Sequence, residues 1–190
     1  MIRHLLRPLS YLFIEHQLKW KVDWLYPFLL AIISTLLVFW LKQFGQVSLY
    51  ADGGIISKIL GFVQVLPGFY IAALAAIATF NKTDIDKTMP SPAPKIDIFI
   101  RGKSVAIELT RRRFLCSMFA FLTAESLILI VLSIFATSFY LPFKEIIHES
   151  WHIWASGIFT IIFLLLFWQM IITSFWGLYY LGDRLHQPDA

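Results

Sequence analysis

Four long runs of apolar residues divide the chain, and shorter polar segments separate them. A helix needs about 20 predominantly apolar residues to cross the hydrocarbon core of a membrane. Each run comes close to that length or exceeds it, so the pattern predicts an all-α membrane protein with a four-transmembrane-helix bundle. The predicted spans are residues 24–41, 55–80, 114–139 and 151–181.

Residues 1–23 have a different pattern, with apolar and polar side chains on opposite faces of a helix. We therefore expect an N-terminal amphipathic helix that lies on the membrane surface. Three residues fall on the wrong side for a clean amphipath: Tyr11, Ile14 and Leu18. Either they contact other protein or the helix is less regular than the pattern suggests.

The insert between the second and third spans, residues 81–113, is the longest polar segment. Prolines at alternate positions up to Pro94 predict an extended spacer rather than a helix. Apolar residues then alternate on both sides of the turn-forming sequence Arg-Gly-Lys at 101–103, which predicts a small β-hairpin over residues 95–110. An isolated hairpin is marginally stable in water, so this one should rest on another part of the protein or on a partner.

Composition supports the membrane assignment. Hydrophobic residues make up 58% of the 190 positions, and the mean hydropathy is +0.72. A soluble chain of this size could not bury that much apolar surface. A single membrane domain is expected at this length, and one cysteine, Cys116, excludes an internal disulfide framework.

Positive charge predicts the orientation. Thirteen of the sixteen Lys and Arg residues lie in the N-terminal segment, the central insert and the C-terminus. The loops after the first and third spans carry the other three, Lys42, Lys58 and Lys144. Because loops rich in Lys and Arg stay in the cytoplasm, we expect a multi-pass protein of the bacterial inner (plasma) membrane with both termini and the hairpin cytoplasmic.

One acid, Glu125, is predicted to lie inside the membrane. It follows Arg113 by about 12 residues, or roughly 18 Å of helix, which places it near the middle of the bilayer. Acids at that depth usually face the bundle interior and mark polar contacts, ion paths or switches. Gln64 and Gln169 are predicted at similar depths, so the three form a candidate intramembrane switch. The structural alternative is that Glu125 joins helices by a hydrogen bond.

The second span has a face of small residues at helical spacing: Gly61, Gly68, Ala72 and Ala76. Small side chains let helices approach closely, so this face should pack against another helix, within the bundle or in a second subunit. Pro67 lies in the same span and can kink it, because proline has no amide hydrogen for the preceding turn.

Basic residues cluster from the hairpin to the start of the third span: Arg101, Lys103, Arg111, Arg112 and Arg113. They are candidates for contact with anionic lipid head groups or with a protein partner. Aromatic stacking platforms and recognition helices do not accompany them, which argues against nucleic acid.

Motifs of enzyme chemistry are missing from the sequence. It has neither a serine elbow nor a P-loop, and neither a dinucleotide-binding glycine motif nor paired catalytic carboxylates. We therefore predict a protein that is not an enzyme, with no catalytic residues, no cofactor and no metal.

The stretch LPGFYIAALAAIATF at 66–80, the proline-rich insert after it and the sequence LTRRRF at 109–114 resemble small membrane subunits of bacterial anti-phage systems, most nearly the KwaA family of the Kiwa system. The resemblance covers the whole chain in outline and transfers no functional residue. It implies a membrane sensor or scaffold that forms homo-oligomers and recruits a cytoplasmic effector protein. The alternative from a different class is an ion channel or pore lined by Gln64, Glu125 and Gln169.

Overall fold

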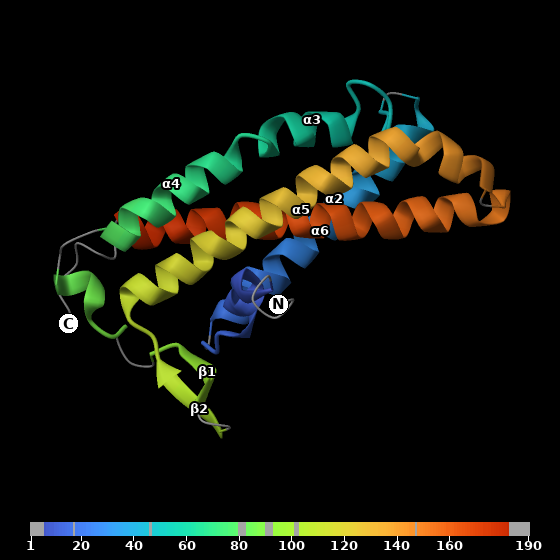
Figure 1. Ribbon diagram of the computed structural model, residues 1–190. Coiled ribbons are helices and arrows are strands. Elements are labelled where there is room, and N and C mark those ends of the chain that lie inside the picture. The colour runs from blue at the N-terminus through green and yellow to red at the C-terminus, as the bar shows by residue number, and fades with distance from the viewer. Residues whose placement is uncertain are drawn as a thin grey trace.

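The computed structural model describes residues 6–16, 18–45, 47–79, 83–89, 93–100, 103–146 and 148–182. Six helices make up most of it (Figure 1), namely η2 (Lys21–Leu25), α2 (Tyr26–Gln43), α3 (Ile55–Val63), α4 (Leu66–Thr79), α5 (Arg111–Ile146) and α6 (Glu149–Gly182). Two short 3₁₀ helices, η1 (Arg7–Phe13) and η3 (Thr83–Asp86), and two strands, β1 (Lys95–Ile100) and β2 (Lys103–Glu108), complete the described elements.

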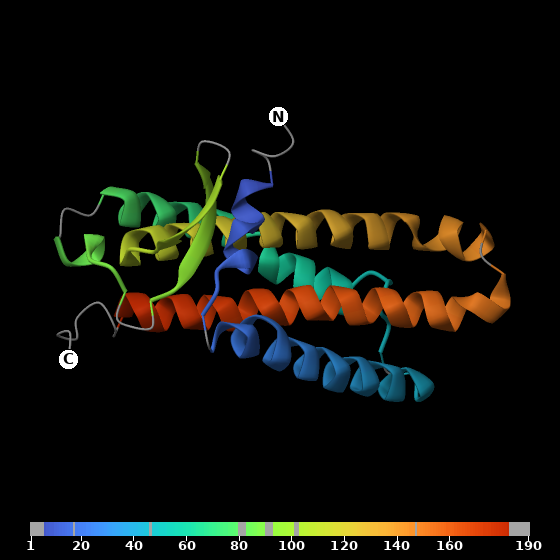
Figure 2. The ribbon, with the colours of Figure 1, turned by 90° about the horizontal axis from the view of Figure 1, so that it is seen from below.

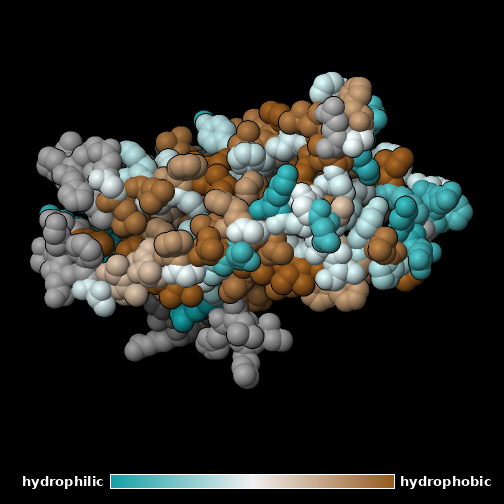
Figure 3. Space-filling view, turned by 90° about the horizontal axis from the view of Figure 1, so that it is seen from above, coloured by the Kyte–Doolittle hydropathy of each residue, from teal (hydrophilic) through white to brown (hydrophobic). Residues whose placement is uncertain are grey.

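Four helical spans among the described residues are long and apolar enough to cross a membrane. They are Lys21–Gln43, Ile55–Thr79, Arg111–Ile146 and Glu149–Gly182. Between 11% and 44% of the most apolar window of each span is buried within the chain, so most of these side chains face outward. Figure 3 shows the resulting apolar surface along the helices and polar groups gathered at one end. This surface suits a lipid environment, as the four predicted spans require.

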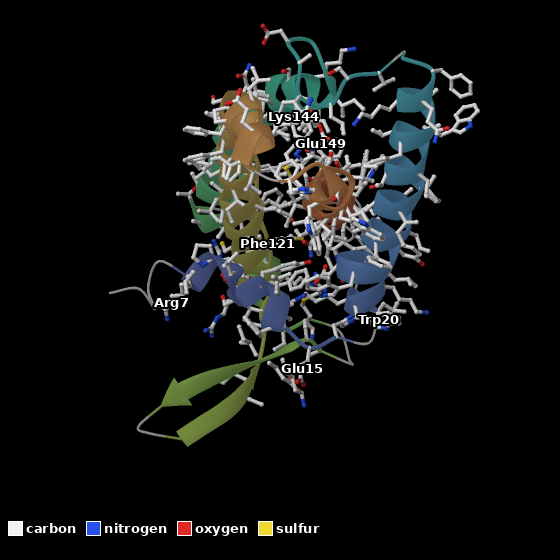
Figure 4. The ribbon with its side chains drawn as sticks, turned by 90° about the vertical axis from the view of Figure 1, so that its right-hand side faces the viewer. Arg7, Glu15, Trp20, Phe121, Lys144 and Glu149 are labelled. Atoms are coloured by element: carbon white, nitrogen blue, oxygen red, sulfur yellow. The ribbon has the colours of Figure 1, made fainter. Side chains whose placement is uncertain are left out.

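The long helices pack side by side. α6 lies between α2 and α5, and α4 packs against α5 (Figure 4). One end of the bundle, which we call the hairpin end, carries the start of α5, the ends of α4 and α6, and the hairpin (Figure 1). The opposite end, called here the turn end, carries the α5–α6 connection and the loop of residues 44–54.

α5 and α6 are longer than predicted, at 36 and 34 residues. α5 begins at Arg111 and continues through Pro142 to Ile146, whereas the sequence suggested a loop beyond residue 139. A proline within a helix removes one hydrogen bond, and the helix continues past Pro142 although the residues around it, from Leu141 to Ile146, are exposed.

The second span is broken between α3 and α4. Gln64 and Val65 form a turn, and α4 begins at Leu66. Pro67 has no amide hydrogen to donate to the carbonyl of Val63 four residues earlier, so the helix cannot continue regularly there. The predicted kink is confirmed.

The hairpin is also confirmed. β1 and β2 pair antiparallel, with Ile96 opposite Ile107 and Lys95 opposite Glu108. The spacer before it is not extended throughout, because Thr83–Asp86 form a 3₁₀ helix whose Ile85 is buried. Burial of apolar side chains against α5 outweighs the extended preference that we inferred from the prolines, of which Pro90 and Pro92 lie outside the described residues.

The prediction of one regular amphipathic helix over residues 1–23 is wrong. η1 ends at Phe13, Ile14 is extended, and helical structure resumes after Leu18. Tyr11 and Ile14, which did not fit the amphipathic pattern, are buried, while Phe13 and Leu18 are exposed. Packing of Tyr11 against α5 and strand-like pairing of Glu15 therefore replace the helix that periodicity predicted.

Candidate functional site

A buried polar cluster lies at the hairpin end of the bundle, built around Asp23. Its side chain is 2% exposed and accepts hydrogen bonds from Lys19 at Oδ2 and from the Tyr11 hydroxyl at Oδ1, the latter over 3.3 Å. Lys19 and Asp23 are four residues apart on one helical face, which brings the opposite charges together. A buried charge pair of this kind is strongly destabilised when one partner is removed.

Tyr11 links this cluster to α5. Its ring stacks on Phe121 with centroids 5.1 Å apart, and the Lys19 Nζ lies 4.2 Å from the Tyr11 ring centroid. Burial, reinforced by the nearby Asp23 carboxylate, raises the pKa of the Tyr11 hydroxyl well above its ordinary value. The hydroxyl therefore stays protonated and donates a hydrogen bond to Asp23.

Gln169 joins α6 to the same cluster through the main chain. Its Nε2 donates a hydrogen bond to the carbonyl oxygen of Asp23 over 2.9 Å. Pro27 lies four residues after Asp23 and cannot donate to that carbonyl, so the Gln169 amide supplies the bond that a regular helix would have made. Gln169 thus has a structural partner other than the predicted Glu125.

Glu125 is buried but unpaired. Its side chain is 2% exposed, and neither carboxyl oxygen has a hydrogen-bond partner among the described residues. Phe121, on which Tyr11 stacks, lies one helical turn before Glu125 in α5. The hydrogen bond between helices that we considered as its structural role is therefore not made in this arrangement. An unsatisfied buried polar group costs about 1–3 kcal/mol, so packing alone does not account for an acid here.

Gln64 does not join Glu125 and Gln169. Its side chain is exposed at the break between α3 and α4, whereas the other two are buried. The prediction that the three polar side chains form one intramembrane group is wrong for this chain. The buried residues of the second span are Ile56, Val63, Tyr70 and Ile77. Gln64 lies outside this stripe, a fact that depth along the helix could not reveal.

The small-residue face of the second span is also exposed. Gly61, Gly68, Ala72 and Ala76 all lie on the outer surface of α3 and α4. A side chain added at Gly61 or Gly68 would meet no atom within 4 Å among the described residues. Packing of this face within the bundle is therefore excluded for this arrangement, and its use between subunits stays a prediction.

Arg112 acts inside the chain. Its guanidinium forms two bonds with the Asp86 carboxylate, 2.6 and 2.9 Å long, and donates to the carbonyls of Ile77 and Ala78 at the end of α4. Carbonyls in the last turn of a helix lack partners within it, so Arg112 caps α4 and ties it to η3. The bonded guanidinium lowers the pKa of the Asp86 carboxyl below its ordinary value.

The other predicted basic contacts differ from one another. Arg111 is buried and Arg113 is exposed, so Arg113 keeps the predicted access to lipid or a partner. Arg101 and the side chain of Lys103 lie outside the described residues. Arg111 is buried and Arg112 is bonded within the fold, and contact of the basic cluster with lipid or a partner stays a prediction.

Main-chain bonds connect the polar cluster to the hairpin. Glu15 follows η1 and exchanges two hydrogen bonds with Lys95 of β1, 2.9 and 3.2 Å long. Figure 2 shows the N-terminal segment lying beside the strands. On the other side, Leu109 bonds to Pro94 and accepts from Met89, just before α5 begins. The hairpin is thus attached both to η1 and to the start of α5.

Sequence reasoning missed Tyr11, Lys19 and Asp23. The spacing of Lys19 and Asp23 and the presence of an acid next to the first apolar run were visible signals. Neither Lys19 nor Asp23 was assigned to a site, because periodicity does not show that the segment folds back against α5.

Comparison of the chain with protein-family models, with curated proteins and with solved structures finds no match. The outline resemblance to the KwaA family therefore remains a prediction.

Proposed function

We propose that this protein is a non-enzymatic sensor or scaffold of the bacterial inner membrane that recruits or regulates a cytoplasmic effector through its hairpin. Membrane lipids surround the bundle, and homo-oligomers form through the small-residue face of the second span. A role in anti-phage defence follows from the outline resemblance to KwaA.

One observation carries the proposal: contacts run from α5, one helical turn from Glu125, to the hairpin. Tyr11 stacks on Phe121, which lies four residues before Glu125, and bonds to Asp23. Glu15, two residues after η1, pairs with Lys95. A change in the packing around Glu125 would therefore shift the segment on which the hairpin rests.

The environment of Glu125 gives a physical reason why the helix bundle would have two packing arrangements. The Glu125 carboxyl has no hydrogen-bond partner among the residues that the structure describes, so a second arrangement in which it gains one would be stabilised by that bond. A stimulus that stabilises the second arrangement shifts the population toward it. The hairpin end reports that shift to the effector.

The channel alternative has less support. It needs Gln64, Glu125 and Gln169 along one path, and in the chain Gln64 faces outward while Gln169 bonds to Asp23. We therefore retain the sensor as the function that this geometry favours.

Photo-crosslinking in cells tests the proposal. A photoreactive amino acid replaces Val105, an exposed residue of β2, or, as a control, Val131, an exposed residue of α5. We expect Val105 to capture a defined soluble cytoplasmic protein and Val131 to capture lipid. Replacing residues 95–108 by a Gly-Ser segment should abolish recruitment of that protein and leave membrane insertion intact. The same products from both positions, or recruitment without the hairpin, would refute the proposal.

A further inference from the structure

An aromatic groove opens at the turn end of the bundle, far from the buried polar cluster. Its volume is about 560 Å³, and α2, α5, α6 and the loop before α3 line it. Phenylalanines form much of its wall: Phe39 from α2, Phe135, Phe139 and Phe143 from α5, and Phe159 from α6. The loop closes one side, where Tyr50 stacks on Tyr140 at 4.1 Å and its hydroxyl lies 3.2 Å from Ser156 Oγ.

Two lysines line the same groove, although they are far apart in sequence. Lys42 comes from the last turn of α2 and Lys144 from the last turn of α5. Figure 4, which faces the turn end, labels Lys144 there. Both side chains are exposed, and neither forms an ion pair with any of the residues that the structure describes.

The membrane topology rule does not explain these lysines. Lys42, Lys58 and Lys144 lie near the end of the bundle that our count assigns to the side poor in positive charge, and two of the three line this groove. Topology would place positive charge at the other end of the bundle. Their convergence on one apolar groove therefore points to an anionic ligand.

The ligand chemistry follows from the two features together. Aromatic walls bind an aliphatic chain, and ammonium groups beside them bind a phosphate through charge-assisted hydrogen bonds. The volume lies within the usual range of small-ligand sites, about 300–1,000 Å³. A phospholipid with an anionic head group combines both parts and is available in the adjoining leaflet.

We propose that this groove binds one acyl chain of an anionic phospholipid, with Lys42 and Lys144 holding its phosphate. The site is independent of the hairpin and of effector recruitment. The two lysines let the groove distinguish anionic from zwitterionic lipids. The phenylalanines contact the acyl chain of the bound lipid.

Photolabelling of the purified full-length protein tests the site. The protein is reconstituted in phosphatidylcholine vesicles with a trace of phosphatidylglycerol that carries a photoreactive acyl chain, or of phosphatidylcholine with the same chain. We expect stronger labelling by phosphatidylglycerol on peptides that line the groove. Because each lysine near a lipid surface contributes about fivefold in affinity, the double variant K42Q/K144Q should lose at least about fivefold of that labelling.

Two further variants locate the effect. Lys58→Gln removes the third lysine, which does not line the groove, and should leave labelling unchanged. Ala155→Phe narrows the groove with both lysines present and should reduce labelling by either lipid. Equal labelling by the two lipids, full labelling of K42Q/K144Q or of Ala155→Phe, or crosslinks from the groove to a second copy would overturn the proposal. Effector recruitment is measured separately, so failure of either proposal leaves the other standing.

Discussion

The two ends of the bundle differ in whether their charged side chains form ion pairs among the described residues. At the hairpin end, oppositely charged side chains are paired within the fold: Lys19 with Asp23, Arg112 with Asp86, and Lys95 with Glu108. At the turn end, Lys42 and Lys144 line an open groove without an ion pair among the described residues. The first arrangement fixes the positions of chain segments, and the second leaves charge accessible to a ligand.

Glu125 differs from both ends, because it is buried within α5 without a hydrogen-bond partner among the described residues. A packed polar cluster with one unsatisfied member has a reason to rearrange, whereas a fully paired cluster does not. The unsatisfied carboxyl of Glu125 therefore suits a part of the bundle that changes its packing, and the paired charges suit parts that keep theirs.

Asp23→Ala should have the largest effect on stability. It removes the partner of buried Lys19 and the acceptor of the Tyr11 hydroxyl, which should lower the free energy of unfolding by about 3–5 kcal/mol. Asp52→Ala is the matched control, because Asp52 is exposed in the loop at the turn end. Denaturant unfolding in detergent measures both variants. Equal losses in the two would show that the paired cluster does not stabilise the hairpin end.

Gly54→Ala should cause the next largest loss in the free energy of unfolding. It tests a tightly packed position at the turn end. A Cβ at Gly54 would lie 2.7–2.9 Å from the carbonyl oxygens of Ser48, Ala51 and Leu49, so the loop must shift. We expect a loss of about 1–3 kcal/mol. Gly182→Ala, where a Cβ also meets nothing within 4 Å in the described structure and which lies outside the small-residue face, should be neutral or slightly stabilising in the same assay. Comparable losses would contradict the loop geometry.

Glu125→Leu should leave stability unchanged or raise it by about 1 kcal/mol, since it removes two unsatisfied oxygens from an apolar interior. The same variant should fail to respond to the stimulus in a recruitment assay, because the group that favours the second arrangement is gone. A clear loss of stability would instead show that Glu125 holds helices together.

The sequence predicted the parts of this fold that depend on regular periodicity. Long apolar runs gave the four spans, alternation gave β1 and β2, and Pro67 gave the break in the second span. These features need no knowledge of what each segment touches.

The parts that sequence missed depend on tertiary contacts. Tyr11 and Ile14 looked like defects in an amphipathic helix and prove to be its buried contacts with the bundle. Gln169 was matched to Glu125 by depth, whereas the carbonyl left free by Pro27 determines its partner. Arg112 looked like a lipid anchor and instead caps α4.

The central claim is that the polar cluster positions the hairpin, and hydrogen exchange of the hairpin amides tests it most directly. Tyr11→Phe keeps the ring on Phe121 but removes the hydroxyl that bonds to Asp23, while Tyr50→Phe removes a hydroxyl at the turn end. We predict that exchange at Glu15 and Lys95 rises up to about tenfold in Tyr11→Phe and stays unchanged in Tyr50→Phe. Identical hairpin exchange in both variants and the wild type would contradict the account.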